Sequence, residues 1–361
     1  MTKSVKHTFI TLCFLFIGSY SFGQKDSIIK YYPATNFTLV GKILETKLPY
    51  QRVDTLINSN LPANVKKRLT RSAGLAISFK TNSKSISAKW CTDSQYPSTG
   101  MTSIAFRGLD LYIKRDGKWQ FAGVGSPQNG KWCSKDKIVQ NLPEGEHECL
   151  LYLPVYSDTK ELEIGIDEGA SISAGSQPFN KRILVYGSSI VQGASASRPG
   201  MIYTSRLSRE TGYNFLNLGM SGAAKMEKEV ADMVAGFEAD AYLLDCIPNS
   251  SPKEVSQRAE YLITEIRKKH ANAPIIFMQS VIREGGNFNQ KVAEKVANQN
   301  KNIAVIIEKL KNNGFKNLHF ITAEDFLGND HEATTDGTHP NDLGFDRMIK
   351  VIKPKIVSII N

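Results

Sequence analysis

Apolar and polar residues alternate in short runs through the first half of the chain, from about Asn36 to Ile166. Alternation with period two is typical of strands that bury one face, and polar turns separate these runs. Two of the runs flank Asp116 and Gly117, a hairpin signal because glycine tolerates a positive φ. Repeated short strands of this kind predict a β-sandwich. The runs with this pattern are 76–81, 85–90, 109–114, 119–123, 148–153 and 162–166.

The pattern changes after 169–180, a stretch rich in serine, glycine and alanine that we interpret as a linker. Beyond Lys181, short apolar runs alternate with longer segments of helical period. Apolar residues form one helical stripe over 255–266, and a second stripe over 292–310 is interrupted at Gln299. Strands that alternate with helices predict an α/β fold with a parallel sheet. The strand candidates are 183–186, 215–218, 242–244, 275–278 and 318–321.

The start of the chain combines a basic end with an apolar run at 8–22. Lys3 and Lys6 precede the run, and small residues lead to an expected cleavage site after Gly23. A run of about 15 residues is shorter than the roughly 20 needed to span a bilayer, and no later run approaches that length. We therefore predict a signal peptide over 1–23, export to the periplasm or the medium, and no integral membrane segment in the mature chain.

Composition narrows the classes of function. With 41% hydrophobic and 22% charged residues, the chain is globular rather than disordered. The net charge is +10, but the basic residues are scattered and no zinc-finger or RNA-binding motif occurs, so we expect no nucleic-acid partner. The length of 361 residues exceeds one ordinary core. We predict a β-domain with its linker over 24–175 and an α/β domain over 176–361.

Four cysteines remain after the predicted cleavage: Cys91, Cys133, Cys149 and Cys246. An exported protein can form disulfides, and three of these cysteines lie in the N-terminal half. One pair can form there, which would leave at least one thiol over, and the sequence does not choose the pair. Since no CxxC spacing occurs, we expect no structural metal site and no cofactor.

Polar loops follow the strands of the predicted parallel sheet, and in such sheets functional groups gather beyond the carboxyl ends of the strands. Ser189 follows the first strand, Gly222 the second and Asn249 the third, while Asp336 and His339 share a late loop. Together these loops supply a hydroxyl, a glycine amide, a carboxamide, a carboxylate and an imidazole.

These groups suit acyl transfer. A serine hydroxyl needs a base within hydrogen-bond reach, and His339 is the candidate base for Ser189. Asp336 can accept a hydrogen bond from the other ring nitrogen and fix the tautomer. The amides of Ser189 and Gly222 and the side chain of Asn249 are candidate donors to the oxyanion of the tetrahedral intermediate.

The loops of the C-terminal half resemble the conserved blocks of the SGNH, or GDSL-type, hydrolases. The resemblance implies a flavodoxin-like three-layer α/β domain, with Ser189 as nucleophile and Asp336 and His339 completing the triad. The stretch 108–112 also resembles the GxDLY signature of a β-domain that precedes some of these hydrolases. The matching positions are Gly187-Ser188-Ser189-Ile190 for the first block, Gly222 for the second, Asn249 for the third, and Asp336 and His339 for the fifth.

Two positions depart from the family pattern. Ser188 stands where the family usually has aspartate, which alters the support of that carboxylate and creates two adjacent serines. Block spacing favours Ser189 as the nucleophile. The third block reads Pro248-Asn249-Ser250, so the asparagine is retained without a neighbouring carboxylate.

Structural roles are the alternatives at each position. Ser-Ser after a strand commonly caps a helix, Gly222 can be a turn residue, and Asn249 can cap the next helix. Other open alternatives concern residues that could support or replace the proposed chemistry. They are Asp245 and Cys246 behind the site or as core packing, Arg198 and Gln279 on substrate or in a solvated or structural role, Gly108, Asp110 and Tyr112 as turn and packing positions of the β-domain or as ligands, and His331 with Asp336 and His339 as metal ligands.

The residues and the resemblance together predict an exported serine esterase that removes O-acetyl groups from an oligo- or polysaccharide. One alternative is a lipid esterase or thioesterase with the same triad. Another is a non-catalytic glycan-binding protein, against which the intact set of Ser189, Asn249, Asp336 and His339 argues. The role of the β-domain is left open.

Overall fold

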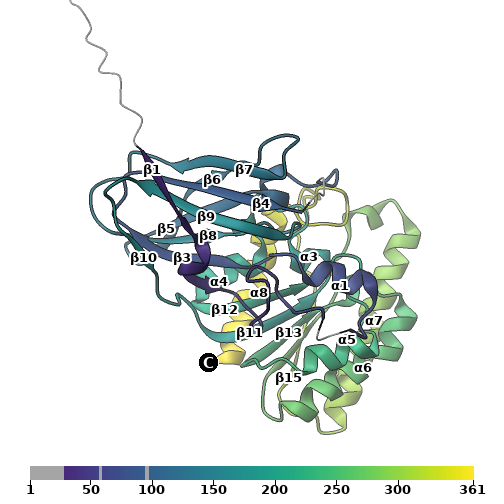
Figure 1. The fold of residues 1–361 in the computed structure, drawn as a ribbon. Coiled ribbons are helices and arrows are strands. Elements are labelled where there is room, and N and C mark those ends of the chain that lie inside the picture. The colour runs from purple at the N-terminus through teal and green to yellow at the C-terminus, as the bar shows by residue number, and fades with distance from the viewer. Residues whose placement is uncertain (1–27, 57–58, 94–96) are drawn as a thin grey trace, which may run out of the picture.

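The computed structural model describes residues 28–56, 59–93 and 97–361. The predicted signal peptide at 1–23 lies outside the described residues. Figure 1 shows a β-rich N-terminal part beside a C-terminal parallel sheet flanked by helices. In the described portion of the chain, no helix is both long enough and apolar enough to cross a membrane.

The N-terminal part is a β-sandwich of two antiparallel sheets, as predicted. Phe79 and Leu111 of one sheet and Ile86 and Trp90 of the other share a buried core, because alternate residues of each strand face inward. The first sheet has the order β1 (Ile29–Pro33), β9 (Thr159–Asp167), β4 (Ile86–Thr92) and β7 (Cys133–Val139). The second has the order β10 (Ile172–Ala174), β3 (Ala76–Thr81), β8 (His147–Tyr152), β5 (Leu109–Arg115) and β6 (Lys118–Gly125), with β2 (Thr38–Val40) also on β3.

The stretch 169–180 is more than a linker. Its residues Ile172–Ala174 form β10, which pairs antiparallel with β3 at the edge of the second sheet. The prediction of a linker was wrong at these positions because a strand of three residues is too short to show apolar alternation, even where it completes a sheet edge. The open question of the disulfide is answered by β4 and β7, where Cys91 and Cys133 face each other and are bonded.

The C-terminal sheet is entirely parallel, and helices on its two faces complete a three-layer arrangement. Its order is β12 (Tyr213–Gly219), β11 (Asn180–Gly187), β13 (Ala241–Asp245), β14 (Ile275–Met278) and β15 (Leu318–Ile321). This is the flavodoxin-like order 2-1-3-4-5, which the family resemblance implied. Side chains of β11 alternate between two cores: Leu184 packs under α5 (Lys228–Ala235), α6 (Pro252–Lys269) and α7 (Gln290–Asn312). Val185 packs under α3 (Ser189–Gln192), α4 (Tyr203–Thr211) and α8 (Asp342–Ile360).

The two parts of the chain share packing. Helix α1 (Ala63–Leu69) comes from the N-terminal part, yet its Val65 and Leu69 lie in the same core as Leu184 of β11. Helix α2 (Ser103–Arg107) likewise places Phe106 in the core on the other face of the sheet. The domain boundary at 175/176 stays a prediction, and both helices lie before it but pack against residues beyond it. Short 3₁₀ turns complete the fold: η1 (Ala34–Asn36), η2 (Pro199–Met201), η3 (Ile247–Asn249) and η4 (Glu284–Asn287).

Helices α6 and α7 follow their predicted stripes. Ser251 begins α6 with a capping box to Glu254, and Pro252 occupies the first turn. The interruption predicted at Gln299 does not break α7. Gln299 is fully buried, and its Nε2 donates to the carbonyls of Ile247 (3.1 Å) and Ser250 at the two ends of η3.

Candidate active site

The candidate residues lie at the carboxyl edge of the parallel sheet. Gly187, which ends β11, pairs with Gly219 of β12 on one side and Asp245 of β13 on the other. The loops that follow these strands therefore begin side by side. The backbone is tight at this point, because a Cβ on Gly187 would lie 2.3 Å from the carbonyl oxygen of Asp245.

The adjacent serines make different contacts. The Ser188 hydroxyl accepts a hydrogen bond from the amide of Ile190 (3.2 Å) and caps α3, and its own amide donates to Asp245 (3.2 Å). Ser188 thus occupies the helix cap, a position that aspartate also suits. Ser189 is the first residue of α3, and its Oγ lies 2.9 Å from Nε2 of His339.

The hydrogen-bond chain continues from His339 to Asp336. Nδ1 of His339 lies 2.7 Å from Oδ2 of Asp336, and Oδ1 of Asp336 accepts from the amides of Thr338 (3.0 Å) and His339 (2.8 Å). Burial favours the neutral acid, but the bonds from His339 and Thr338 outweigh it and hold the pKa of Asp336 below its usual range. The structure therefore brings Ser189, His339 and Asp336 together in the order that the sequence predicts, with the carboxylate ionised.

The candidate oxyanion donors lie on neighbouring loops. Gly222 has φ of +70° in a turn where the Met220 carbonyl accepts from the amides of Ala223 (2.9 Å) and Ala224 (3.1 Å). Asn249 ends η3, and its Oδ1 accepts from the Ala224 amide at 3.4 Å. This bond ties the second and third blocks together and directs the NH₂ group of the carboxamide away from Ala224. Ser189 opens α3, where the first amides have no partner within the helix.

Comparison with known proteins gives the family. Residues 180–357 match the GDSL-like lipase/acylhydrolase family, and residues 29–172 match the GxDLY N-terminus of SGNH hydrolase-type esterases. A protein from Bacteroides ovatus ATCC 8483, described as a GDSL-like lipase, is 55% identical, with a TM-score of 0.90 over 92% of this chain and 98% of its own. The chain belongs to the GDSL-like lipase/acylhydrolase family.

More distant structures share the fold. The salicylyl-acyltransferase SsfX3 is 18% identical, with a TM-score of 0.72 over 92% of this chain and 97% of its own. A family two carbohydrate esterase from Cellvibrio japonicus is 11% identical, with a TM-score of 0.60 over 92% of this chain and 98% of its own. A comparison with curated protein sequences found no match. Family membership makes the protein a serine hydrolase that acts on carboxylic ester bonds.

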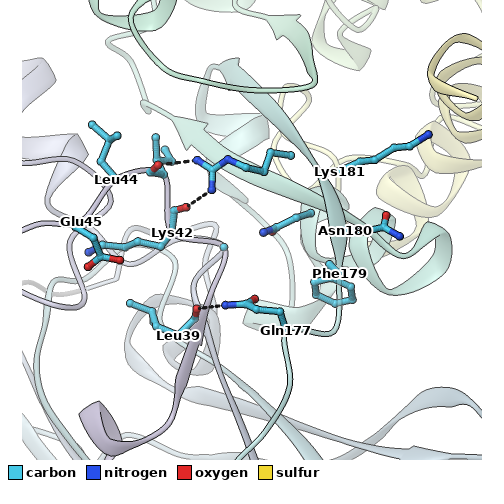
Figure 2. Close-up of a pocket in the computed structure, with 12 residues that line it drawn as sticks. Leu39, Lys42, Leu44, Glu45, Gln177, Phe179, Asn180 and Lys181 are labelled. Carbon is cyan, nitrogen blue, oxygen red and sulfur yellow. Dashed lines mark hydrogen bonds between the residues drawn. The ribbon is translucent and has the colours of Figure 1, made fainter.

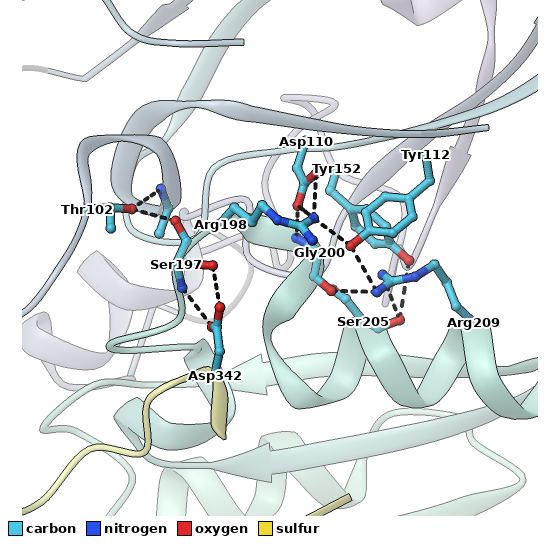
Figure 3. Close-up of polar contacts among 11 residues, drawn as sticks. Thr102, Asp110, Tyr112, Tyr152, Ser197, Arg198, Gly200, Ser205, Arg209 and Asp342 are labelled. Atoms are coloured by element: carbon cyan, nitrogen blue, oxygen red, sulfur yellow. Dashed lines mark hydrogen bonds and ion pairs between the residues drawn. The ribbon is translucent and has the colours of Figure 1, made fainter. Parts of the chain in front are cut away.

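The family's GxDLY motif contacts the C-terminal part directly (Figure 3). Asp110 is fully buried, and its carboxylate accepts from Nη1 of Arg198 (2.8 Å) and from the amide of Gly200 (2.7 Å). The Tyr112 hydroxyl accepts from Arg198 (2.6 Å) and Arg209 (3.1 Å). These contacts give Arg198 a structural role. Asp110 and Tyr112 were expected to be turn and packing positions of the β-domain, but their side chains form polar contacts with the C-terminal part.

Two other candidates also have structural contacts. Oε1 of Gln279 accepts from the amide of Ala323 at 3.1 Å, so this side chain joins the ends of β14 and β15. Asp245 lies beneath the turn that contains Ser188 and Ser189, where burial raises its pKa to about 7 although the Tyr203 hydroxyl donates to it (3.1 Å). Cys246, next to it, is fully buried.

The possible metal site is not formed. His331 lies with Nδ1 2.7 Å from Oε2 of Glu284 instead of joining Asp336 and His339. No cluster of three or more histidine, cysteine or acidic residues that suits a metal occurs among the described residues.

Sequence reasoning missed two residues that hold the site together. Gln192 of α3 is fully buried, donates to Val155 (3.0 Å) and accepts from the amide of Ser221 (3.0 Å). Arg283 follows β14 and donates to the carbonyl of Pro248 (2.7 Å), next to Asn249. Burial lowers the pKa of Arg283, and the negative charge of Asp336 opposes this shift. Position after a strand was the only signal for Arg283, and nothing in the sequence pattern singled out Gln192.

A separate pocket of about 500 Å³ lies at the opposite edge of the sheet (Figure 2). Asn180, the first residue of β11, lines this pocket, whereas Ser189 lies beyond Gly187, the last residue of the same strand. Across it, Arg182 donates to the carbonyl of Ile43 (2.7 Å) and Gln177 donates to that of Leu39 (3.0 Å). The pocket is therefore remote from the hydroxyl of Ser189.

Proposed function

We propose that Ser189, His339 and Asp336 are the catalytic triad of this esterase. Nε2 of His339 takes the proton as Oγ of Ser189 attacks the ester carbonyl, and the imidazolium then gives that proton to the departing alcohol. Water then attacks the acyl-serine as Nε2 of His339 takes its proton, and that proton passes to Oγ as the Oγ–acyl bond breaks and the carboxylic acid leaves. Asp336 keeps Nδ1 protonated and stabilises the imidazolium. The continuous chain of hydrogen bonds at 2.9 and 2.7 Å is the observation that carries this proposal.

The amides of Ser189 and Gly222 and the carboxamide of Asn249 bind the oxyanion in this proposal. They come from three loops that meet at one sheet edge, and the Asn249–Ala224 bond links two of them. Loss of one such donor typically lowers kcat by about 10²–10³. We expect that loss for N249A on p-nitrophenyl acetate, with a smaller change in KM.

The substrate we propose is an O-acetylated oligo- or polysaccharide outside the cytoplasm. Several structures that share the fold are carbohydrate esterases, among them an acetyl xylan esterase from Butyrivibrio proteoclasticus. The basic and apolar start of the sequence supports export. Cell fractionation that left the full-length protein in the cytoplasm would contradict the export half of the proposal.

The deciding experiment measures acetate release from a panel of acetylated polysaccharides, with S189A and H339A as controls. A companion series of p-nitrophenyl esters of increasing acyl length separates the alternatives. Preference for acetyl supports the proposal, whereas rates that rise with chain length favour a lipid esterase or thioesterase. Glycan binding without turnover at any pH would favour a binding protein. Wild-type turnover in S189A would overturn the role of Ser189.

A further inference from the structure

One peptide group of the proposed oxyanion hole is held by a side chain from the N-terminal part. Nε of Arg68, on α1, donates to the carbonyl oxygen of Ser221 at 2.9 Å. The Ser221 carbonyl and the Gly222 amide are the two polar ends of the same peptide bond. Because a peptide is planar and trans, fixing the direction of its carbonyl also fixes the direction of its N–H.

We propose that Arg68 is a positioning residue of the oxyanion hole, which orients the Gly222 amide through the Ser221 carbonyl. This inference rests on the proposed function, since it needs Gly222 to be an oxyanion donor. A cationic donor on the carbonyl also polarises the peptide and strengthens its N–H as a donor. Preorganised donors of this kind are effective because they need no reorientation when charge develops.

The backbone of Arg68 is itself held in place by a second arginine. Arg52 is fully buried, and its Nη1 donates to the carbonyls of Asn217 (3.0 Å) and Gly219 (3.0 Å) at the end of β12. Its Nη2 donates to the carbonyl of Arg68 (2.5 Å), so one guanidinium ties the backbone of α1 to the strand that leads to Gly222. Arg68 therefore reaches Ser221 from a backbone that is already held in place.

The amide of Ser221 is also held in place, by a side chain of α3. The Ser221 amide donates to Oε1 of Gln192 (3.0 Å), three residues beyond Ser189. Ser221 thus has its amide held by α3 and its carbonyl held by α1. Both peptide planes that flank Ser221 are determined by contacts outside their own loop. Gly222, with a φ of +70°, adopts the left-handed conformation that glycine tolerates best.

The test compares the full-length wild type with R68M, R68Q and K67A. Methionine places a methyl group, and glutamine an amide nitrogen, at the position along the side chain where arginine carries Nε. R68M therefore removes the donor, whereas R68Q keeps a neutral one. Lys67 is exposed on the same helix, so K67A is the matched control for loss of a positive charge. The readouts are kcat and KM for p-nitrophenyl acetate per active site counted with a fluorophosphonate, together with Tm.

We expect R68M to lose about tenfold in kcat, less than removal of a whole donor, with KM within about twofold. R68Q should recover most of that loss, and K67A should match the wild type. R68M at wild-type kcat, or R68Q as slow as R68M, would overturn the inference. If R68M does not fold, R68K replaces it, because lysine keeps the charge but has a methylene at the Nε position. R68K must then be slower than R68Q, and equal rates overturn the inference.

These outcomes are separate from those of the proposed function. A wild type that turns over no ester contradicts the proposed function itself. An active wild type whose activity depends on Ser189 but not on Arg68 contradicts only the positioning role.

Discussion

At the residue scale, Ser188 and Ser189 are adjacent but their hydroxyls have different partners. The Ser188 hydroxyl accepts a hydrogen bond from the backbone of α3, and the Ser189 hydroxyl is hydrogen-bonded to His339. Block spacing in the sequence favoured Ser189, and the contacts agree with that choice. The cap explains how the first turn of α3 is satisfied without the aspartate that the family usually carries at position 188, since serine and aspartate both accept from the amides of a first turn.

The pair S188A and S189A tests this division. We expect S189A to lose at least about 10³ in kcat, because the nucleophile is removed. S188A should stay within about threefold of the wild-type kcat but lose about 1 kcal/mol of unfolding free energy, because a helix cap is removed. Kinetics on p-nitrophenyl acetate and urea unfolding measure the two effects. An inactive but stable S188A would reverse the assignment.

Asp245 makes stability depend on pH. In the unfolded chain its carboxyl has a pKa of 3.8, and burial raises the folded value to about 7. Between these pH values the folded protein keeps a proton that the unfolded chain has lost, so the free energy of unfolding falls as pH rises. The contribution is present in full below the unfolded pKa and is lost toward pH 7.

We therefore expect the stability of D245N to increase relative to that of the wild type as pH rises. Asparagine stays neutral and can still accept from the Tyr203 hydroxyl, which donates to Asp245 in the wild type. Between pH 4 and 7 the difference in unfolding free energy should change by a few kcal/mol in favour of D245N. Urea unfolding of both proteins at several pH values measures it. A difference in unfolding free energy that is constant with pH would show that burial does not shift the pKa of Asp245.

At the element scale, α7 supports the loop that carries Asn249. The Gln299 side chain donates to the carbonyls on both sides of η3, which is why a polar residue interrupts the apolar stripe of this helix. Ile247 and Ser250 are themselves fully buried, so neither carbonyl has ready access to water.

Replacement of Gln299 by leucine should harm both stability and activity. Q299L keeps the apolar stripe but leaves the Ser250 carbonyl without the Gln299 donor and the Ile247 carbonyl with only the Ser250 amide, at a cost of roughly 1–3 kcal/mol. We expect kcat to fall by roughly tenfold, less than for loss of Asn249 itself, because the donor is displaced and not removed. N298L, at an exposed position one residue earlier, is the control. Equal behaviour of Q299L and N298L would contradict a bracing role.

The pattern of the sequence predicts a strand or helix where one face of that element is buried, because the buried residues then recur with a local period. The runs over 76–81 and 275–278 became β3 and β14 with the same bounds. Edge strands were missed: β7 has mostly exposed or half-buried polar residues, and β10 consists of Ile172, Ser173 and Ala174. Their state is set by the neighbouring strand, and no apolar alternation records it.

The same distinction applies to the site. Ser189, Gly222, Asn249, Asp336 and His339 follow strands or share a loop, so local position identified them. The supports of the site come from far away: the Arg68–Ser221 contact joins residues 153 positions apart. A single sequence carries no local signal for such a pair.

At the scale of the whole molecule, the N-terminal part and the hydrolase part are mutually dependent. Val65 and Leu69 of α1 belong to the core beneath α5, α6 and α7. Deletion of the N-terminal part would expose that core and remove Arg52 and Arg68 from the end of β12. Such a deletion cannot separate a substrate-binding role of the β-sandwich from loss of folding. Single contacts between the two parts are therefore the more informative targets.

The Asp110–Arg198 pair is the sharpest of these contacts. Asp110 is on β5, and Arg198 lies in the loop between α3 and η2. In that loop the neighbouring Ser197 donates from its amide to Asp342 (2.9 Å), at the start of α8 and three residues beyond His339. The GxDLY motif thus holds the loop after α3, and that loop is in turn hydrogen-bonded to the segment following His339.

We expect D110N to weaken this connection. Asparagine keeps the shape of aspartate but removes the charge that pairs with Arg198 and one acceptor. Breaking a buried pair costs about 3–5 kcal/mol. Since Arg198 retains 21% side-chain exposure, we expect a smaller loss of about 2 kcal/mol here. The matched control is E146Q, because the Lys80–Glu146 pair is exposed and should contribute less than about 1 kcal/mol. Urea unfolding and p-nitrophenyl acetate kinetics of both variants test this. If D110N is as stable and as active as E146Q, the motif does not link the β-sandwich to the catalytic loops.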